Sequence, residues 1–313
     1  MLLRLLVSVS GFAALSSAGC GDGAHRTIPA VNANREGAEL AKPKDAPQGM
    51  TTPPNLKDVQ LEMKGMKFVP LPKGTFYMGW DKWNGSAKKT DINEDFEIGV
   101  YTVTQGLWQA VMGKNPSYFS RTSPFFPHLK RLRDSIKEIT DEELKRFPVE
   151  SVSWDDCQEF IEKLNEVEKG NGWVYRLPRE AEWEYACRGG ATSEEDCSYC
   201  FYLSKPTNDL SSKDANFDGE FPGGNGEKGS FLKRTTTVGS YAPNKLGLYD
   251  MHGNVWQWCD ELETPNGSRR VLRGGCYGIS GGGYCAAGYR SGATPSLRYS
   301  DAGLRLVRVP SPR

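Results

Sequence analysis

Thiols are the most reactive side chains in this sequence, which contains eight cysteines. Cys197 and Cys200 form a Cys-x-x-Cys pair, a spacing found in zinc sites. A zinc site would need a second such pair or nearby histidines, and the three histidines, His25, His128 and His252, are widely separated. From the spacing alone, a disulfide, free buried thiols and no special role all remain open for the pair.

The composition excludes several classes of protein. The 39 Lys and Arg residues balance the 39 Asp and Glu residues. The chain therefore has no basic field for phosphates, and we expect no nucleic-acid partner. A hydrophobic fraction of 38% excludes a multi-span membrane protein, and 11% aromatic residues excludes wholesale disorder. The 35 glycines indicate many tight turns and loops.

Residues 1–19 have the pattern of a signal peptide. Arg4 precedes an apolar run over residues 5–15, and small residues follow directly before Cys20. Small residues before a Cys resemble a bacterial lipoprotein signal, although Ser17 stands where that motif usually carries Leu. We therefore expect an exported protein, lipidated at Cys20 and anchored to the bacterial outer membrane or cell surface. An ordinary signal peptide with an incidental Cys is the alternative.

Residues 20–60 are predicted to form the lipidated N-terminus and a flexible tether. The segment is rich in proline and poor in large apolar residues, so it cannot bury enough surface to fold. The globular domain is predicted over residues 61–313, and the lipid anchor is its only expected membrane contact. We expect a monomer. Without Cys20 the chain retains seven cysteines, an odd number, so a monomer carries at least one free thiol.

The hydrophobic pattern predicts a loop-rich α+β domain with two main helices and few short strands. An apolar stripe at helical spacing follows the capping residue Ser153 and is formed by Cys157, Phe160, Ile161 and Leu164. The second main helix is expected at residues 178–188. Shorter helices are expected after the capping residues Thr104 and Thr140, the latter in a charged, solvated insertion. Strands are expected at residues 67–70, 74–78, 96–103, 237–241, 271–275 and 303–309.

Several strings, in order along the chain, resemble one family. They are FPVESVSW at residues 147–154, YRLPREAEWEYA at 175–186, GLYDMHGNVWQW at 247–258, Arg-Gly-Gly at 273–275 and GLRLVR at 303–308. This set is similar to the formylglycine-generating-enzyme, or sulfatase-modifying-factor, domain over about residues 62–309. The resemblance implies an elaborated C-type-lectin-like fold.

The resemblance also provides a test for enzymatic activity. The family's enzymes oxidise a substrate Cys with two copper-binding cysteines, three and eight residues beyond the Ser of an Arg-Gly-Gly-Ser segment. Here Cys276 replaces that Ser, and Ile279 and Tyr284 occupy the two Cys positions. Thiolates are the expected ligands of Cu(I), and Cys276 with Cys285 would be a substitute pair at a different spacing. We therefore expect no catalytic residues and no enzyme. A copper-dependent formylglycine-generating oxidase is one alternative.

Calcium is the other cofactor that the resemblance raises. Family members can hold calcium at the turn that matches GNVWQW, with an acidic or amide side chain before it and a Glu inside it. Asp250 matches the first position, but Gln257 replaces the Glu, and calcium prefers carboxylate oxygens. Asn216 resembles part of a second calcium loop whose acidic partner is unclear. We expect no metal and no cofactor, and calcium is the one that stays open.

The composition of the last fifty residues differs from that of the rest. Lys, Glu, Gln, Met and Trp together number 63 in residues 1–263 and none in residues 264–313, where about twelve would be expected at the upstream rate. The residue types that remain can all be encoded by codons ending in C, and the five missing types cannot. Part of the bias is expected anyway, because this family's C-terminal part is rich in Arg, Gly and Ser.

The pattern resembles the variable region of a diversity-generating-retroelement target protein, in which template adenines are randomised. The variable region would cover about residues 271–306. Scaffold residues would be retained at Arg273, Gly274, Gly275, Arg290, Pro295, Arg298 and Gly303. The displayed ligand-binding residues would be Tyr277, Gly278, Ile279, Ser280, Gly283, Tyr284, Gly288, Tyr289, Ser291, Ala293, Thr294, Leu297, Tyr299, Ser300 and Asp301. We name these fifteen residues the tail surface.

Tyrosines interspersed with Gly, Ser and Ala are typical of antibody paratopes, because Tyr offers large, stiff, amphipathic contact area. Tyr277, Tyr284, Tyr289 and Tyr299 follow this pattern, although each could equally face the core. The sequence therefore predicts a surface lipoprotein that binds variable macromolecular ligands, either protein or glycan. A static envelope lipoprotein with an inactive domain is the remaining alternative.

Overall fold

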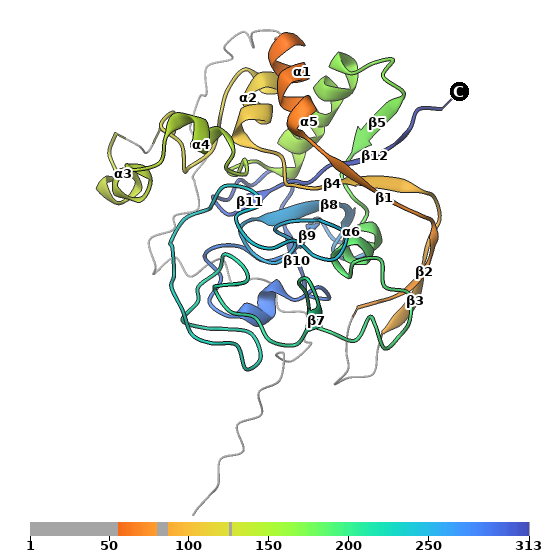
Figure 1. Cartoon of the computed structure of the whole chain (residues 1–313). Coiled ribbons are helices and arrows are strands. Elements are labelled where there is room, and N and C mark those ends of the chain that lie inside the picture. Colours follow the sequence, from red (N-terminus) through yellow and green to blue (C-terminus); the bar gives the residue numbers. More distant parts are fainter. Residues whose placement is uncertain (1–55, 80–86, 125–126, 313) are drawn as a thin grey trace, which may run out of the picture.

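The computed structural model describes residues 56–79, 87–124 and 127–312, and these form a mixed α+β domain with long loops (Figure 1). The predicted signal peptide and the lipidation site at Cys20 lie outside these residues. Within the described ranges, no helix is both long enough and apolar enough to cross a membrane.

The first four-stranded sheet joins both ends of the domain, in the order β1-β4-β12-β5. Its strands are β1 (Phe68–Leu71), β4 (Phe96–Gly99), β12 (Val307–Pro310) and β5 (Trp173–Arg176). Val307 lies opposite Ile98 of β4, and Val309 lies opposite Val174 of β5. The last strand of the chain therefore occupies the interior of this sheet.

The second four-stranded sheet carries the C-terminal part of the chain, in the order β10-β9-β8-β11. It comprises β8 (Trp256–Leu262), β9 (Arg270–Arg273), β10 (Arg290–Ala293) and β11 (Ala302–Gly303). Two separate pairs, β2 (Gly74–Met78) with β3 (Lys88–Ile92) and β6 (Phe201–Tyr202) with β7 (Pro206–Thr207), complete the strands. The predicted variable region thus begins in β9 and passes through the edge strand β10.

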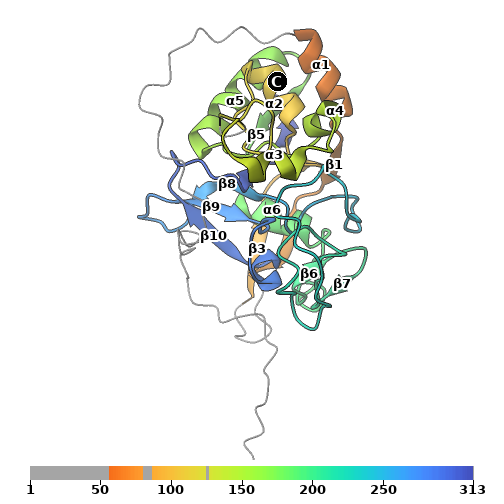
Figure 2. The same cartoon turned by 90° about the vertical axis from the view of Figure 1, so that its left-hand side faces the viewer.

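Six α-helices are present in the described residues, two more than the two main and two shorter helices expected. They are α1 (Leu56–Gly65), α2 (Gln105–Met112), α3 (Lys130–Ile136), α4 (Asp141–Lys145), α5 (Trp154–Val167) and α6 (Glu180–Cys187). The predicted apolar stripe of α5 is buried, and the Ser153 hydroxyl accepts a hydrogen bond from the Asp156 N–H, so this helix and its cap are confirmed. Figures 1 and 2 show α1, α2 and α5 on one side of the first sheet, with the second sheet and the long loops on the other.

Three expectations need correction. Val59 of α1 is fully buried in the main core, so the folded domain includes residues 56–60, which we expected in the tether. Residues 237–241 form a turn rather than a strand, because Gly239 has a left-handed φ of 77° and the Ser240 N–H bonds the Thr237 carbonyl. The strand expected from residue 96 ends at Gly99, and the one expected at 303–309 divides between β11 and β12.

The charged insertion at residues 128–147 is more than a solvated loop. Its helices α3 and α4 bury Leu132, Ile136 and Leu144 in a separate apolar cluster with Phe119 and Phe147. The predicted capping box of Thr140 and Glu143 is present at the start of α4. Because Tyr277 packs against this cluster, the insertion supports the beginning of the tail surface.

Candidate functional site

The tail surface is built on the loops between β9 and β11. These loops contain the short 3-10 helix η1 (Gly282–Cys285) and the edge strand β10. In Figure 1 the blue ribbon of η1 lies on the opposite side of the second sheet from α1. The η1 part of the tail surface therefore lies away from α1, whereas Pro295 and Tyr299 lie beside the start of α5, where their carbonyls accept hydrogen bonds from the Asp155 and Ser151 N–H groups.

Thirteen of the fifteen predicted residues keep some exposure, and two do not. Ser280 and Thr294 are exposed, and eleven others are partly exposed. Ser291 and Ala293 are only 1% and 6% exposed because β10 pairs with β9 and turns these side chains inward. Assigning Ser291 and Ala293 to a displayed surface was wrong.

Tyr277 mainly supports the tail surface from beneath. Its ring packs edge-on against Phe119 with 5.2 Å between ring centroids, and its N–H donates to the Asn254 carbonyl at 2.9 Å. Burial raises the pKa of the Tyr277 hydroxyl well above its ordinary value. This side chain is therefore a packing residue that keeps only a partly exposed edge.

Tyr284 and Tyr289 form an aromatic pair that remains partly exposed. Their rings meet edge to face with centroids 5.1 Å apart. Tyr289 also packs on Trp256 of β8 at 6.1 Å. Such pairs hold aromatic rings in fixed orientations, so these tyrosines form a pre-positioned contact surface.

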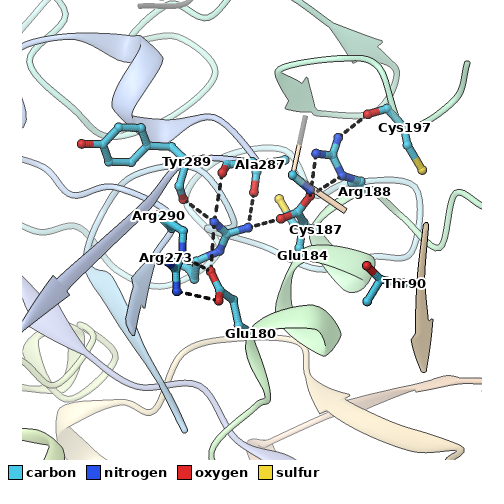
Figure 3. A network of polar contacts seen from close by, with 12 residues as sticks. Thr90, Glu180, Glu184, Cys187, Arg188, Cys197, Arg273, Ala287, Tyr289 and Arg290 are labelled. Atoms are coloured by element: carbon cyan, nitrogen blue, oxygen red, sulfur yellow. Dashed lines mark hydrogen bonds and ion pairs between the residues drawn. The ribbon is translucent and has the colours of Figure 1, made fainter. Parts of the chain in front are cut away.

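Arg273 fastens the middle of the tail surface through the backbone. Its guanidinium donates to three successive carbonyls, those of Ala287, Gly288 and Tyr289, at 2.7, 3.1 and 2.7 Å. Figure 3 shows these contacts, with the Tyr289 ring pointing away from them. Since every residue type offers a backbone carbonyl, this anchor does not depend on the side chains at positions 287–289.

Acidic residues of α6 hold the arginine in place. Arg273 pairs with the buried Glu184, which also binds Arg188 at 2.6 Å. Burial alone would raise the pKa of Glu184, but the charges of Arg188 and Arg273 keep it below its ordinary value. Glu180 binds Arg290 through both carboxylate oxygens, at 2.8 and 3.0 Å (Figure 3). The family motif on α6 thus supplies the anions under the tail surface.

Three further framework groups bond the backbone of the tail. The Asp218 N–H donates to the Ile279 carbonyl at 3.3 Å, and the Ser151 N–H donates to the Tyr299 carbonyl at 2.9 Å. The Gly282 N–H in turn donates to the Phe221 carbonyl at 2.7 Å. The path of the tail is therefore fixed at several points without reference to its own side chains.

The glycines of the tail separate into two kinds. A Cβ atom added at Gly278 or Gly283, both predicted binding positions, meets nothing within 4 Å. A Cβ at Gly282, which was not predicted to vary, would lie 2.3 Å from the backbone nitrogen of Gly223. Larger side chains can therefore be displayed at the first two positions and not at the third.

The carboxylates of two acids, Glu150 and Asp301, lie beneath the far end of the tail surface. Glu150 accepts hydrogen bonds from the Tyr118 and Phe119 N–H groups and the Ser151 hydroxyl, and burial raises its pKa to about 8. The Asp301 carboxylate accepts a hydrogen bond from the Cys276 thiol at 3.3 Å, and burial raises the pKa of this acid too. The side chain of Asp301 is thus turned inward, although the residue was predicted to be a ligand contact.

Sequence reasoning missed the contributions of Asp218, Phe221 and Glu150 to this site. Glu150 lies within a family motif, and the other two lie about sixty residues before the loop that they hold. No local spacing signals such contacts, because they arise from the path of long loops.

The thiols Cys276 and Cys285 do not form a prepared copper site. Both are buried and free, and burial raises the pKa of Cys285 to about 12 and that of Cys276 well above its ordinary value. Cu(I) binds the thiolate form, which this environment disfavours. Cys197 is also free, so it forms no disulfide with Cys200.

The turn proposed for calcium is filled by protein groups. The Gln257 side-chain oxygen accepts hydrogen bonds from Trp183 Nε1 and Arg305 Nε, each at 2.8 Å. The Asp250 carboxylate accepts one from the Gly239 N–H at 2.8 Å. Protein donors therefore already engage both side chains, and Gln257 is a neutral amide, so these residues do not fit a calcium ligand set. Among the described residues, no cluster of three or more His, Cys, Asp or Glu side chains could hold a metal ion.

Comparison with known proteins identifies the family. Residues 55–310 match the sulfatase-modifying factor enzyme 1-like domain. The chain belongs to this family. The formylglycine-generating enzyme of Bos taurus is 28% identical to it over 94% of this chain and 86% of that protein. The inactive Cα-formylglycine-generating enzyme 2 of Bos taurus is 30% identical over 67% of this chain and 75% of that protein.

A solved structure relates this sulfatase-modifying factor domain to a variable protein. The Treponema denticola variable protein 1 superposes with a TM-score of 0.53 and 25% identity, covering 77% of this chain and 94% of the other. The family and its C-type-lectin-like α+β fold, both expected from the motifs, are confirmed. The family thus includes enzymes, an inactive relative and a variable protein.

Proposed function

We propose that this protein is a surface-displayed lipoprotein whose tail surface binds macromolecular ligands and is diversified by a retroelement. Lipidation of Cys20 would tether the domain to the membrane. The tail surface would then be the part of the domain that meets the ligand. No catalytic residue and no cofactor take part in this proposal.

One observation carries the proposal: the framework holds the tail by backbone atoms while its variable side chains have room to change. Arg273, Asp218 and Ser151 all bond tail carbonyls, and Gly278 and Gly283 have open space around them. A scaffold that must accept many sequences needs this separation between positioning and display. The tail's lack of Lys, Glu, Gln, Met and Trp supports the same reading.

An oxidase is the less supported reading. The Cys positions of the family's enzymes hold Ile279 and Tyr284 here. The nearby thiols Cys276 and Cys285 are buried with raised pKa values. Neither thiol is prepared as a metal ligand or as a nucleophile.

A designed library tests the proposal directly. Gly278, Ser280, Gly283, Tyr284 and Thr294 are randomised together, and the displayed variants are selected against a panel of unrelated purified proteins. We expect most variants to keep melting temperatures within a few degrees of the starting protein, since partly exposed sites contribute little to stability. We also expect specific binders to emerge.

A matched library provides the control. It randomises an equal number of inward-facing tail residues, including Tyr277, Ser291 and Ala293, which lie against the framework. Most of its members are expected to unfold, because buried positions tolerate few residue types. Equal tolerance in both libraries, or no binders from the first, would refute the proposed surface.

The locus offers a second and cheaper test. We expect the neighbouring DNA to carry a near-copy of the 3′ end of the gene, with adenine-rich Asn codons at the tail-surface positions and a reverse-transcriptase gene beside it. Sequencing the flanks checks this. Flanks without such a copy would instead favour a static envelope lipoprotein.

A further inference from the structure

A second loop is joined to the tail surface at several points. The buried side chain of Asp218 accepts a hydrogen bond from the Ser280 hydroxyl at 3.2 Å, and its N–H bonds the Ile279 carbonyl. The Phe221 carbonyl accepts from the Gly282 N–H at 2.7 Å. Residues 218–223 therefore run alongside residues 279–282 as one unit.

The contact between the two loops is backbone against backbone. A Cβ at Gly282 would stand 2.3 Å from the Gly223 nitrogen and 2.9 Å from the Pro222 carbonyl carbon. No side chain fits between them. Gly223 is itself held by two hydrogen bonds with Leu210, at 2.9 and 3.0 Å. Apart from the hydrogen bond donated by the Ser280 hydroxyl, these contacts between the two loops thus do not depend on which side chains the tail carries.

Phe221 is the apolar side chain that this second loop presents to solvent. It is 45% exposed, although its backbone is bonded directly to the tail. It lies outside the region of about residues 271–306 predicted to vary. Diversification would change the tail beside it and leave Phe221 in place.

We infer that Phe221 is a constant anchor of the binding surface, used by ligands whatever the sequence of the tail, and that these ligands are proteins with an apolar contact residue. The inference rests on the proposed function. It adds a residue that gives every tail sequence the same preference for an apolar contact on the ligand, while the tail side chains determine which ligand binds.

The groups of the second loop favour a protein over a glycan. The Asp218 carboxylate accepts hydrogen bonds from the Ser280 hydroxyl and from the Glu220 N–H. Glycan recognition needs polar side chains that are free to bond sugar hydroxyls, and this carboxylate is already paired within the protein. Phe221 is exposed on the second loop, and Tyr284 and Tyr289 are partly exposed on the tail that bonds this loop. Accessible aromatic rings are enriched at the centre of protein interfaces.

The test uses binders from the tail library as defined pairs, each with its own purified target protein. Phe221→Ala is introduced into at least ten independent binders, and the dissociation constant is measured for each pair. We expect affinity to fall roughly tenfold or more in most pairs, as for a buried aromatic contact. Leu61→Ala is the control, because Leu61 is an exposed apolar residue on α1 and its loss should leave affinity within twofold.

The outcomes separate the two ideas. Binders that keep their affinity after Phe221→Ala would overturn the constant anchor and leave the proposed function standing. A library that yields no binders would overturn both. The melting temperatures of the Phe221→Ala variants must stay within a few degrees of those of their parent binders. In a parallel experiment on an oligosaccharide array, we expect no binding that depends on Phe221. A positive array would refute the protein assignment.

Discussion

Replacing Gly282 with Ala is expected to destabilise the protein by about 3 kcal/mol, whereas the same change at the adjacent Gly283 should stay within about 0.5 kcal/mol. Both glycines lie in the short helix η1, so the effect of a Gly→Ala change on helix propensity is the same at the two positions. The two positions differ in the space around an added Cβ atom. At position 282 the Cβ would lie 2.3 Å from the backbone nitrogen of Gly223, whereas at position 283 nothing lies within 4 Å of it. Backbone atoms cannot rotate away as a side chain can.

Urea denaturation of the two variants and the wild type measures this difference. Gly278→Ala serves as a second tolerant position, because nothing lies within 4 Å of its added Cβ. Equal stability of the Gly282→Ala and Gly283→Ala variants would mean that the loop at residues 218–223 moves aside. The tail and that loop would then not form a single unit.

Replacing Arg273 with Ala should lower the free energy of unfolding by about 3–5 kcal/mol, the usual effect of removing one partner of a buried ion pair. The change leaves the buried Glu184 with Arg188 and the Gly79 N–H as partners, and it leaves three tail carbonyls without their shared donor. Urea denaturation gives the energy. Hydrogen exchange of residues 286–290 should show faster opening of the tail than of α5.

Two controls make the result specific. Arg273→Lys keeps the charge, but a single ammonium group cannot reproduce the fork that reaches three carbonyls and a carboxylate, so an intermediate loss is expected. Arg298→Ala removes a partly exposed ion pair with Asp156 and should change stability by less than about 1 kcal/mol. An Arg273→Ala variant as stable as Arg298→Ala would show that the tail is held by other contacts.

The sequence predicted the helices that have strong local signals. The stripe on α5 and the caps at Thr104, Thr140 and Ser153 were all found where expected. Strand pairing was not predictable, because β12 pairs with strands more than a hundred residues earlier. The strand β8 was hidden in a family motif that carries no alternation, since four of its residues in succession are buried.

The sequence predicted where the tail surface lies in the chain, but it assigned some of its residues wrongly. The amino-acid composition identified the segment, and the open space around Gly278 and Gly283 agrees with it. Composition cannot show, however, which side chains point outward. Ser291 and Ala293 turned out to be buried, and the side chain of Asp301 is directed toward Cys276. Only the register of β10 on β9 and the packing beneath the loops determine which side chains face outward.

The interior position of β12 has a consequence for biosynthesis. The first sheet cannot close until residues 307–310, which follow the whole tail surface, have been translated in the correct frame. Any replacement of residues 277–301 that shifts the reading frame or stops translation early also removes the strand between β4 and β5. Such chains cannot complete their core and become substrates for proteases. Under the proposed function, folding would therefore act as a proofreading step, because only in-frame tails give a complete domain.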